Sequence, residues 1–275
     1  MGGLNGLILP LEGEASWPPG EHSFGSRYLF PGVESGWLTN HAAQAVIGAI
    51  LVIGFWLWMA RGQSIVPGKK QAVGEFVYDF VRNGIARDIL GPEFRKYLPL
   101  LLTLFSFILV NNLFGQFFLF MFPTFSKIGF AWGLALVAWV VYNGAGIKKH
   151  GLFGYLKHAT LPAGVPKFLW PLIIPLEFLS NIIVRPLTLG LRLFANLFAG
   201  HLVIVVFVVG GTMLLTAVDQ MGTQFPVPLL NVAGVVSILF SFAIFALELL
   251  VGSIQAYIFT VLTAQYVSSA IAEDH

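Results

Sequence analysis

Residues 228–271, PLLNVAGVVSILFSFAIFALELLVGSIQAYIFTVLTAQYVSSAI, form an apolar run with a single charge, Glu248. A second apolar run, from Trp170 to Val209, carries Glu177, Arg185, Arg192 and His201. Each run has about 40 residues, roughly twice the length of a helix that crosses the bilayer perpendicularly. Each is therefore either a pair of spans or one long, tilted or bent helix.

The composition of the chain predicts an integral membrane protein. Charged residues make up 10% of the 275 residues, against about 25% in an average soluble protein, and the mean hydropathy is +0.82. The 26 Phe and 7 Trp exclude a disordered chain, and a net charge of +2 argues against a basic nucleic-acid binder. The chain has no Cys, which excludes disulfides and thiolate metal sites.

The distribution of Lys and Arg predicts the topology. Seven basic residues lie between Arg61 and Lys96 and four between Asn143 and Leu169, whereas Gly211–Pro226 has none. Basic loops stay on the cytoplasmic side, so the N-terminus is expected outside and the C-terminus inside. Splitting only one of the long runs would reverse the chain beyond it, which favours a hairpin of two long tilted helices.

The predicted fold is an all-α integral membrane protein with about five membrane helices and one surface helix. Residues 1–41 are expected to be an extramembrane arm and residues 42–275 the membrane domain. Apolar residues recur at helical spacing over 68–90, between charged residues, which predicts an amphipathic helix on the inner membrane surface. Lys148–Pro166 is rich in Gly and Pro and is expected to be a connector. The membrane helices are expected at about 42–60, 98–122, 128–143, 170–215 and 228–272.

Charges inside these helices need an explanation, because each costs at least about 2.5–3.5 kcal/mol to insert. Arg192 has apolar flanks on both sides, and an arginine stays protonated in proteins. It is therefore a fixed positive charge that needs a counter-charge, from this chain or from a partner subunit. Arg185, seven residues before Arg192, lies on nearly the same side of the helix; it is either an interfacial residue that snorkels or a charge within the membrane layer.

Helical phase groups the polar residues into two stripes. At about 100° per residue, Thr188, Arg192 and Asn196 share one face of their helix, and His201 points almost opposite to Arg192. On the last helix Glu248, Gln255 and Tyr266 are separated by near-integral numbers of turns. Two such stripes on a hairpin can line a polar path or face an oligomeric partner, although polar stripes also serve simple helix–helix bonding.

The run RPLTLGLRLFANLFAGH, residues 185–201, closely resembles the signature of subunit a of the F-type ATP synthase membrane sector. Residues 248–266, ELLVGSIQAYIFTVLTAQY, resemble the C-terminal motif of that family, and Asn112-Leu-Phe-Gly115 resembles its Asn-Leu-x-Gly/Asp element. The resemblance covers the chain from about Ala42 to the C-terminus. Because Gly115 stands where some members have Asp, no acidic role transfers to that position.

The resemblance implies a proton-translocating stator subunit with two half-channels. Arg192 matches the arginine that faces the carboxylates of the rotating c-ring, with Asn196 and Gln255 as polar neighbours. His201 and Glu248 match a pair in one half-channel, placed on the outer side by the family, and Tyr266 lies near the other. Glu177 is near an acidic position of the family whose spacing to the Arg-Pro pair varies among members.

The resemblance further implies partners and a location. The expected partners are the c-ring subunits through the Arg192 face, b-type peripheral stalk subunits and the lipid bilayer, with no nucleic acid. The expected location is an energy-transducing membrane, the bacterial plasma membrane, crossed several times. No catalytic residue, metal or cofactor is expected in the chain alone; it is a component of the complex that makes ATP.

Two other classes of protein compete with this interpretation. A self-contained channel or secondary transporter needs its own site and gate, typically with inverted repeats or broken helices, and no repeat is evident. An intramembrane enzyme needs a nucleophile–base pair or a metal cluster. The six His include no pair spaced four residues apart for a metal.

Overall fold

The computed structural model describes residues 39–61, 68–116, 124–161, 166–216 and 226–272. The regular elements longer than one residue in these segments are all helical. Five helical segments are long and apolar enough to cross a membrane: Asn40–Ala60, Lys69–Phe114, Ile128–Thr160, Lys167–Thr216 and Val227–Ile271. The all-α membrane fold with five candidate spans is therefore confirmed.

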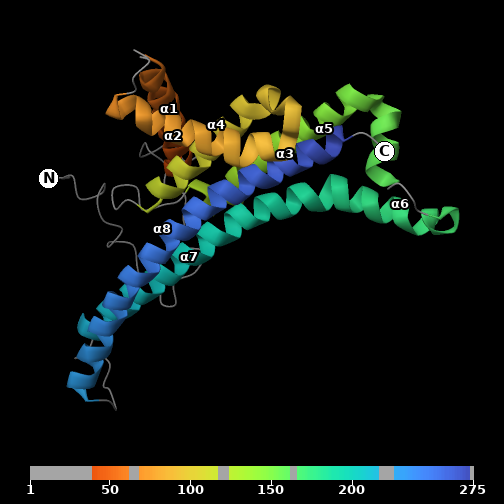
Figure 1. The fold of residues 1–275 in the computed structure, drawn as a ribbon. Helices are drawn as coiled ribbons and strands as arrows, with labels where there is room; N and C mark the ends of the chain where they lie inside the picture. The colour runs from red at the N-terminus through yellow and green to blue at the C-terminus, as the bar shows by residue number, and fades with distance from the viewer. Residues whose placement is uncertain (1–38, 62–67, 117–123, 162–165, 217–225, 273–275) are drawn as a thin grey trace.

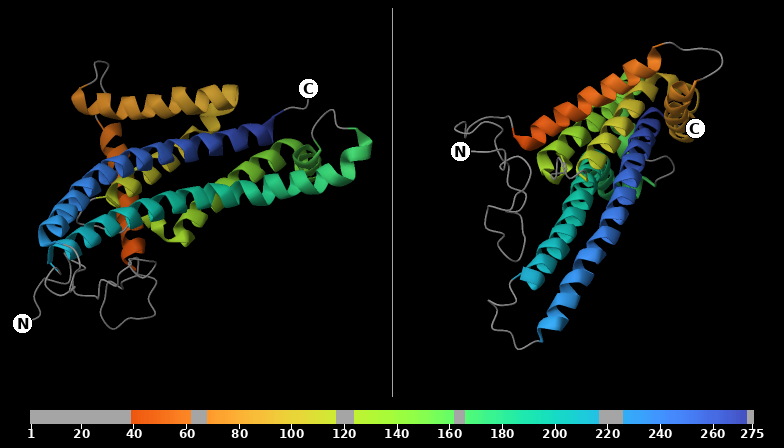
Figure 2. Two further views of the ribbon diagram at one scale, coloured as in Figure 1. Left: turned by 90° about the horizontal axis from the view of Figure 1, so that it is seen from below. Right: turned by 90° about the vertical axis from the view of Figure 1, so that its left-hand side faces the viewer.

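Two long helices form a curved antiparallel hairpin. They are α7, Arg185–Thr216, and α8, Val227–Ile271, which run side by side in Figure 1 and in the right view of Figure 2. At 1.5 Å per residue their lengths are about 48 and 68 Å, well over the roughly 30 Å of a hydrocarbon core. Each long apolar run thus belongs to one continuous helical segment and is not a pair of spans.

Glycines set the close approach of α7 and α8 in the half of the hairpin near its turn. A Cβ added at Gly211 would lie 3.0 Å from the carbonyl oxygen of Gly234 and 2.9 Å from Ile238. A Cβ at Gly234 would in turn lie 2.9 Å from the carbonyl oxygen of Gly211. Small residues of this kind let the backbones of membrane helices meet without side chains between them.

The chain enters α7 through a widened turn. The short helix α6, Trp170–Phe178, leads into a π-helical turn, η7, over Leu179–Val184. The predicted helix over 170–215 is therefore one helical segment that changes its pitch before Arg185.

The core lies where α4, α5, α7 and α8 meet. α4, Phe94–Phe114, buries Leu101 and Ile108, and α5, Ile128–Thr160, buries a ladder of alanines, Ala131, Ala135 and Ala138. Leu189, Leu193 and Leu197 bury one face of α7 against this core. Because these three leucines are spaced four residues apart, they lie on one face of α7, and the opposite face is left uncovered.

α1, Asn40–Ala60, is capped by the side chain of Thr39, which accepts a hydrogen bond from the backbone N–H of Ala42 at 3.3 Å. It packs on α4, and Trp56 Nε1 donates to Ser106 Oγ at 3.2 Å. Most of its other side is apolar and exposed, including Ile50 and Ile53.

Residues 69–90 are helical, as expected, but they consist of three pieces. α2, Lys69–Val81, continues into a π-helical turn, η3, Arg82–Arg87, and a short helix α3, Asp88–Leu90. The segment ends at Gly91, whose φ of 56° suits glycine, and η4, Gly91–Glu93, leads into α4. α2 runs crosswise to α1 in Figure 2.

Three predicted boundaries are wrong. α1 includes His41, which the sequence assigns to the arm, and α4 begins at Phe94. The third membrane helix does not end at residue 143: α5 reaches Thr160, with a break at Gly151, where φ is 72°. Most of the predicted connector is therefore helix. Residues 1–38 of the predicted arm, 117–123 of the predicted second span and the turn at 217–225 lie outside the described residues.

The extension of α5 has a packing cause. Asn143 and Gly144 look like a helix stop, but the Asn143 side chain donates to the carbonyl oxygen of Trp139 at 2.7 Å, inside the helix. Its Oδ1 accepts a hydrogen bond from Tyr155 Oη at 2.8 Å. The ring of Tyr155 lies against Gly146, where a side chain would collide with it. Tertiary contacts therefore override the low helix propensity of Asn and Gly.

Candidate functional site

Arg192 lies on the uncovered face of α7. Its neighbours Leu189 and Leu193 are buried, while Arg192 itself is exposed. Within the segments that the structure describes, its guanidinium has neither a hydrogen bond nor an ion pair. Figure 1 shows α7 along the lower edge of the molecule, with α8 and the α1–α5 helices above it. The charge is thus presented away from the fold of this chain.

Asn196, one turn after Arg192, connects this face to α8. Its Nδ2 donates to Gln255 Oε1 at 3.3 Å. Gln255 is 2% exposed. The two predicted polar stripes therefore meet at this pair, next to Arg192.

Glu248 is buried in the interface between α7 and α8. It is 5% exposed, and its carboxyl group lies against Gly200, where a Cβ would be 2.9 Å from Cδ and from Oε1. His201 follows Gly200 and is half-buried. The structure thus places Glu248 against the turn of α7 that carries His201.

α4 adds amides to the surroundings of Glu248. Asn112 Nδ2 donates to the carbonyl oxygen of Gly252, one turn after Glu248, at 2.8 Å. The buried side-chain amide of Gln116 faces the Glu248 carboxyl group. Asn111, beside Asn112, accepts a hydrogen bond from Thr124 Oγ1 at 3.1 Å. We call Glu248, Gln116, Asn111, Asn112 and Thr124 the outer polar cluster, after the side of the membrane on which Glu248 is expected from the sequence.

α1 brings further buried polar groups to this cluster. His41 and Gln44 are 1% and 4% exposed, and they share a face of α1 with Gly48. Gly48 packs directly on Asn111, because a Cβ there would lie 2.6 Å from Asn111 Nδ2. Gln44 lies one turn before Gly48 on the same buried face of α1. Sequence reasoning assigns no role to His41 or Gln44.

A second polar group gathers where α5, η7, α7 and α8 meet. The Arg185 guanidinium lies 5.1 Å from the ring centroid of Tyr266, and the rings of Tyr266 and Tyr142 are 5.6 Å apart. Arg185 therefore stacks on an aromatic ring of α8, a contact that both alternatives for this residue allow. We call Arg185, Tyr266, Tyr142, Asn181 and Glu177 the inner polar cluster, a name that follows the topology expected from the sequence.

The widened turn η7 supplies the acceptors of the inner polar cluster. Tyr142 Oη donates to the carbonyl oxygen of Asn181 at 3.0 Å, and Trp139 Nε1 donates to that of Ile182 at 2.9 Å. Asn181 Nδ2 donates to the carbonyl oxygen of Ala159 at 2.6 Å and lies 3.1 Å from Glu177 Oε2. Glu177 and Tyr266, predicted separately, thus belong to one group.

The two clusters lie on either side of Arg192 along α7. Arg185 is seven residues before it and Gly200 eight residues after it, which corresponds to about 10 and 12 Å along the axis. Buried polar groups bind ordered water, and ionisable groups within a membrane layer mark the paths of protons and ions. Among the described residues, no three His, Asp or Glu side chains gather in a way that could hold a metal ion.

Comparison with known proteins identifies the family of the chain. The family model described as ATP synthase A chain matches residues 42–268. The chain belongs to the ATP synthase subunit a family. It is 44% identical over 279 residues to the ATP synthase subunit a of a Nocardioides species, with 98% of each chain covered.

Two further relatives show the range of similarity. The ATP synthase subunit a of Pseudarthrobacter chlorophenolicus is 40% identical, with 98% of each chain covered. That of Streptomyces lividans is 36% identical over 94% of this chain and 88% of the relative. As a subunit a, the chain is one component of the large F-type ATP synthase complex and serves its proton-translocating membrane sector. Its several candidate spans and bacterial relatives fit a multi-pass protein of the plasma membrane.

Proposed function

We propose that this subunit a is the stator of the rotary motor, in which Arg192 separates two half-channels and faces the carboxylates of a rotating ring of c subunits. The observation that carries the proposal is the exposed, unpaired guanidinium of Arg192 on the uncovered face of α7. A permanent charge without a counter-charge in the described part of its own chain calls for an acid from another molecule.

In this proposal the outer polar cluster is one half-channel. Protons from outside pass the buried amides of α1 and α4 and reach Glu248 and His201, which relay them or order water. Asn196 and Gln255 are the polar neighbours of the ring carboxylate. The carboxylate takes up its proton here and turns away into lipid in its neutral form, which costs less than burying a charge.

The inner polar cluster is the other half-channel. A ring carboxylate that returns from lipid meets this cluster, gives up its proton toward Tyr266, Tyr142 and Glu177, and approaches Arg192 as an anion. The fixed charge of Arg192 favours the ionised form of the carboxylate and repels a hydrated proton. Neither half-channel crosses the membrane alone, so protons pass only with rotation.

The energy for rotation comes from the transmembrane potential, which supplies about 2.3 kcal/mol per charge at 100 mV. The chain carries no catalysis of its own in this scheme; it converts proton flow into torque on the ring. Peripheral stalk subunits of the b type hold it against that torque. The N-terminus lies outside and the C-terminus in the cytoplasm.

The test is the substitution Arg192→Ala in the intact complex, assayed in inverted membrane vesicles. ATP synthesis driven by a proton gradient is expected to be abolished, because ring carboxylates are no longer ionised at that position. The matched control is Arg61→Ala, which removes an exposed arginine at the end of α1. Synthesis at the wild-type rate in Arg192→Ala vesicles would refute the mechanism.

A second measurement separates the proposal from a self-contained transporter. The purified chain alone, reconstituted in vesicles, is expected to carry no proton current without the ring. Proton flux at the rate of the complex, carried by the isolated chain, excludes the rotor mechanism.

A further inference from the structure

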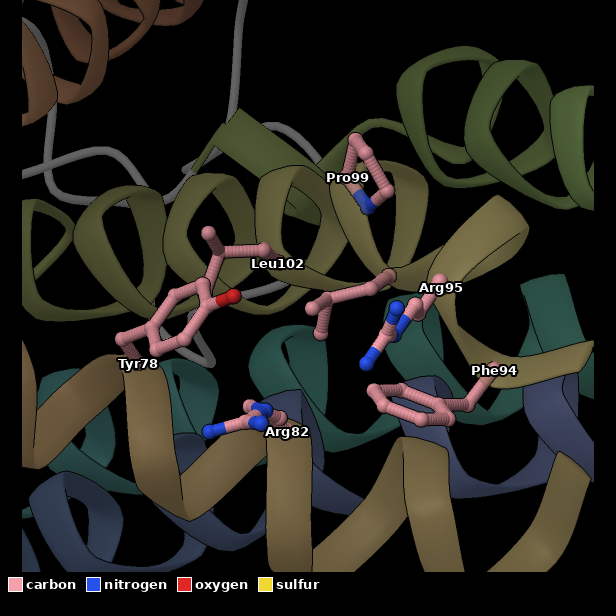
Figure 3. A pocket seen from close by; sticks show the side chains of 7 residues that line it. Tyr78, Arg82, Phe94, Arg95, Pro99 and Leu102 are labelled. Carbon is pink, nitrogen blue, oxygen red and sulfur yellow. The ribbon is translucent and has the colours of Figure 1, made fainter. Parts of the chain in front are cut away.

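A hollow of about 420 Å³ opens between α2, η3 and the start of α4. Its lining includes no residue of either polar cluster. Tyr78 of α2 and Arg82 of η3 form one wall, and α4 forms the other. Figure 3 shows Tyr78 and Leu102 on one side of the hollow, Arg95 and Phe94 on the other, and Arg82 below. The lining residues are Tyr78, Arg82, Phe94, Arg95, Leu98, Pro99 and Leu102.

Two guanidinium groups gather around one ring in this hollow. The guanidinium carbon of Arg82 lies 6.0 Å from the ring centroid of Phe94, and that of Arg95 lies 5.9 Å from the same centroid. Arg82 forms an ion pair with Asp79 at 3.8 Å, with both side chains well exposed. Such an exposed pair is weak, and Arg95 has no carboxylate partner in the described segments.

The rest of the lining is apolar and belongs to a membrane helix. Leu98, Pro99 and Leu102 lie along the first turns of α4, directly after the basic pair Arg95-Lys96. A molecule that fills the hollow therefore meets two cations at one end and hydrocarbon along α4. Arginine pairs with phosphate through two parallel hydrogen bonds, and basic pockets between membrane helices suit the headgroups of anionic lipids.

We propose that this hollow binds one anionic phospholipid, with the headgroup phosphate between Arg82 and Arg95 and an acyl chain along Leu98 and Leu102. A free phosphate ion would satisfy the arginines but leave the apolar wall uncovered. An acidic peptide segment would have to place its own polar backbone against the apolar side chains of α4. A phospholipid satisfies both ends at once. The proposal is independent of the half-channels and stands or falls without them.

The test uses the intact ATP synthase complex in nanodiscs of phosphatidylcholine that contain a small amount of phosphatidylglycerol with a photoactivatable acyl chain. Illumination is expected to label the peptide that contains Leu98 and Leu102. Each arginine that contacts the headgroup phosphate should contribute about fivefold to binding, the effect of about 1 kcal/mol. Labelling in the double variant Arg82→Gln/Arg95→Gln should therefore fall about 25-fold.

The matched control is Arg87→Gln. Arg87 is exposed, lies in the same turn η3 as Arg82, and does not line the hollow. Its labelling is expected to stay within about twofold of wild type, because an exposed charge that does not contact the headgroup is largely screened by salt. Equal losses in Arg87→Gln and in the double variant would show a diffuse surface effect and overturn the proposal.

Two measurements on the unchanged complex keep the proposal testable if the double variant does not assemble. A photoactivatable phosphatidylcholine should label the same peptide much less than phosphatidylglycerol does; equal labelling overturns the proposal. Millimolar inorganic phosphate should leave the labelling unchanged, and its loss would mean a site for free phosphate and contradict the proposal.

A photoreactive amino acid in place of Leu102 shows whether a lipid or a protein segment fills the hollow. It should form a lipid adduct in the intact complex, because an acyl chain is expected along this residue. An adduct with another protein of the complex would mean a protein partner and contradict the proposal.

Discussion

The carboxyl group of Glu248 lies directly against Gly200, at the point where α8 faces the turn of α7 that precedes His201. A Cβ at position 200 would lie 2.9 Å from Cδ and Oε1 of Glu248 and 3.1 Å from its Cγ. The absence of a side chain at position 200 therefore leaves room for the acid between the two helices.

Gly200→Ala is expected to slow proton translocation while the complex still assembles. The new methyl group displaces the flexible end of Glu248 and not the backbone, so the helices keep their contact. We expect a loss of ATP-driven proton uptake of about tenfold, the effect of roughly 1.4 kcal/mol. The control is Gly133→Ala in α5, where a Cβ meets nothing within 4 Å.

A second substitution should restore part of the proton translocation that Gly200→Ala removes. Glu248→Asp shortens the acid by one methylene, so the double variant Gly200→Ala/Glu248→Asp should pump faster than Gly200→Ala alone. If Gly200→Ala pumps at the wild-type rate, the position of the Glu248 carboxyl group does not matter for proton transfer.

Tyr266 should act through its ring as well as its hydroxyl group. Tyr266→Leu removes the stack with Arg185, a cation–π contact of about 1–2 kcal/mol when desolvated. Tyr266→Phe keeps the stack. We expect Tyr266→Leu to lower ATP synthesis in vesicles by about tenfold and Tyr266→Phe by much less. Equal losses in the two variants would mean that the hydroxyl group, not the contact with Arg185, is what the protein needs.

Water should reach the buried polar face of α1. The chain has no cysteine, so single cysteines introduced at Gln44 and Gln116 report on their own surroundings. A charged, water-soluble thiol reagent should react with both and inhibit proton uptake, because only the thiolate reacts and it forms only where water reaches. Ile50→Cys, on the apolar exposed side of α1, is expected not to react. Absence of reaction at both test positions argues against an aqueous path beside α1.

Two neighbouring glycines of α5 should behave in opposite ways. A side chain at Gly146 collides with the ring of Tyr155, whereas one at Gly144 meets nothing within 4 Å. Gly144→Ala should stabilise the helix by up to about 1 kcal/mol, and Gly146→Ala should destabilise it by about 1–3 kcal/mol, the usual range for overpacking. The midpoint of thermal inactivation of the complex measures both. Equal midpoints for the two variants would contradict the packing of the Tyr155 ring against Gly146.

Hydropathy and helical phase are enough to predict the membrane helices and the face of α7 that carries Arg192. Both signals are local: the length of an apolar run predicts a span, and the spacing of Thr188, Arg192 and Asn196 places them on one face. The sequence predicts a stop at Asn143 and Gly144 because their local propensity is poor. Only the contacts with Tyr155, twelve residues away, explain why the helix continues.

The surroundings of the predicted site residues could not be derived in the same way. Tyr142, Asn181 and Tyr266 come from three different helical elements, and no spacing within one helix shows that they meet. His41 falls in the predicted arm because it precedes the apolar run, while its burial depends on α4. Periodicity predicts which residues share a face of one helix, whereas each polar cluster combines residues from several helices.

The widened turn over Leu179–Val184 has a consequence for how the length of this chain can change. A π-helical turn holds one residue more than an α-helical turn. Removing one residue there would restore ordinary helix while leaving the rotation of α7, and with it the direction of Arg192, as it was. A one-residue deletion in this stretch is thus absorbed before it reaches Arg192.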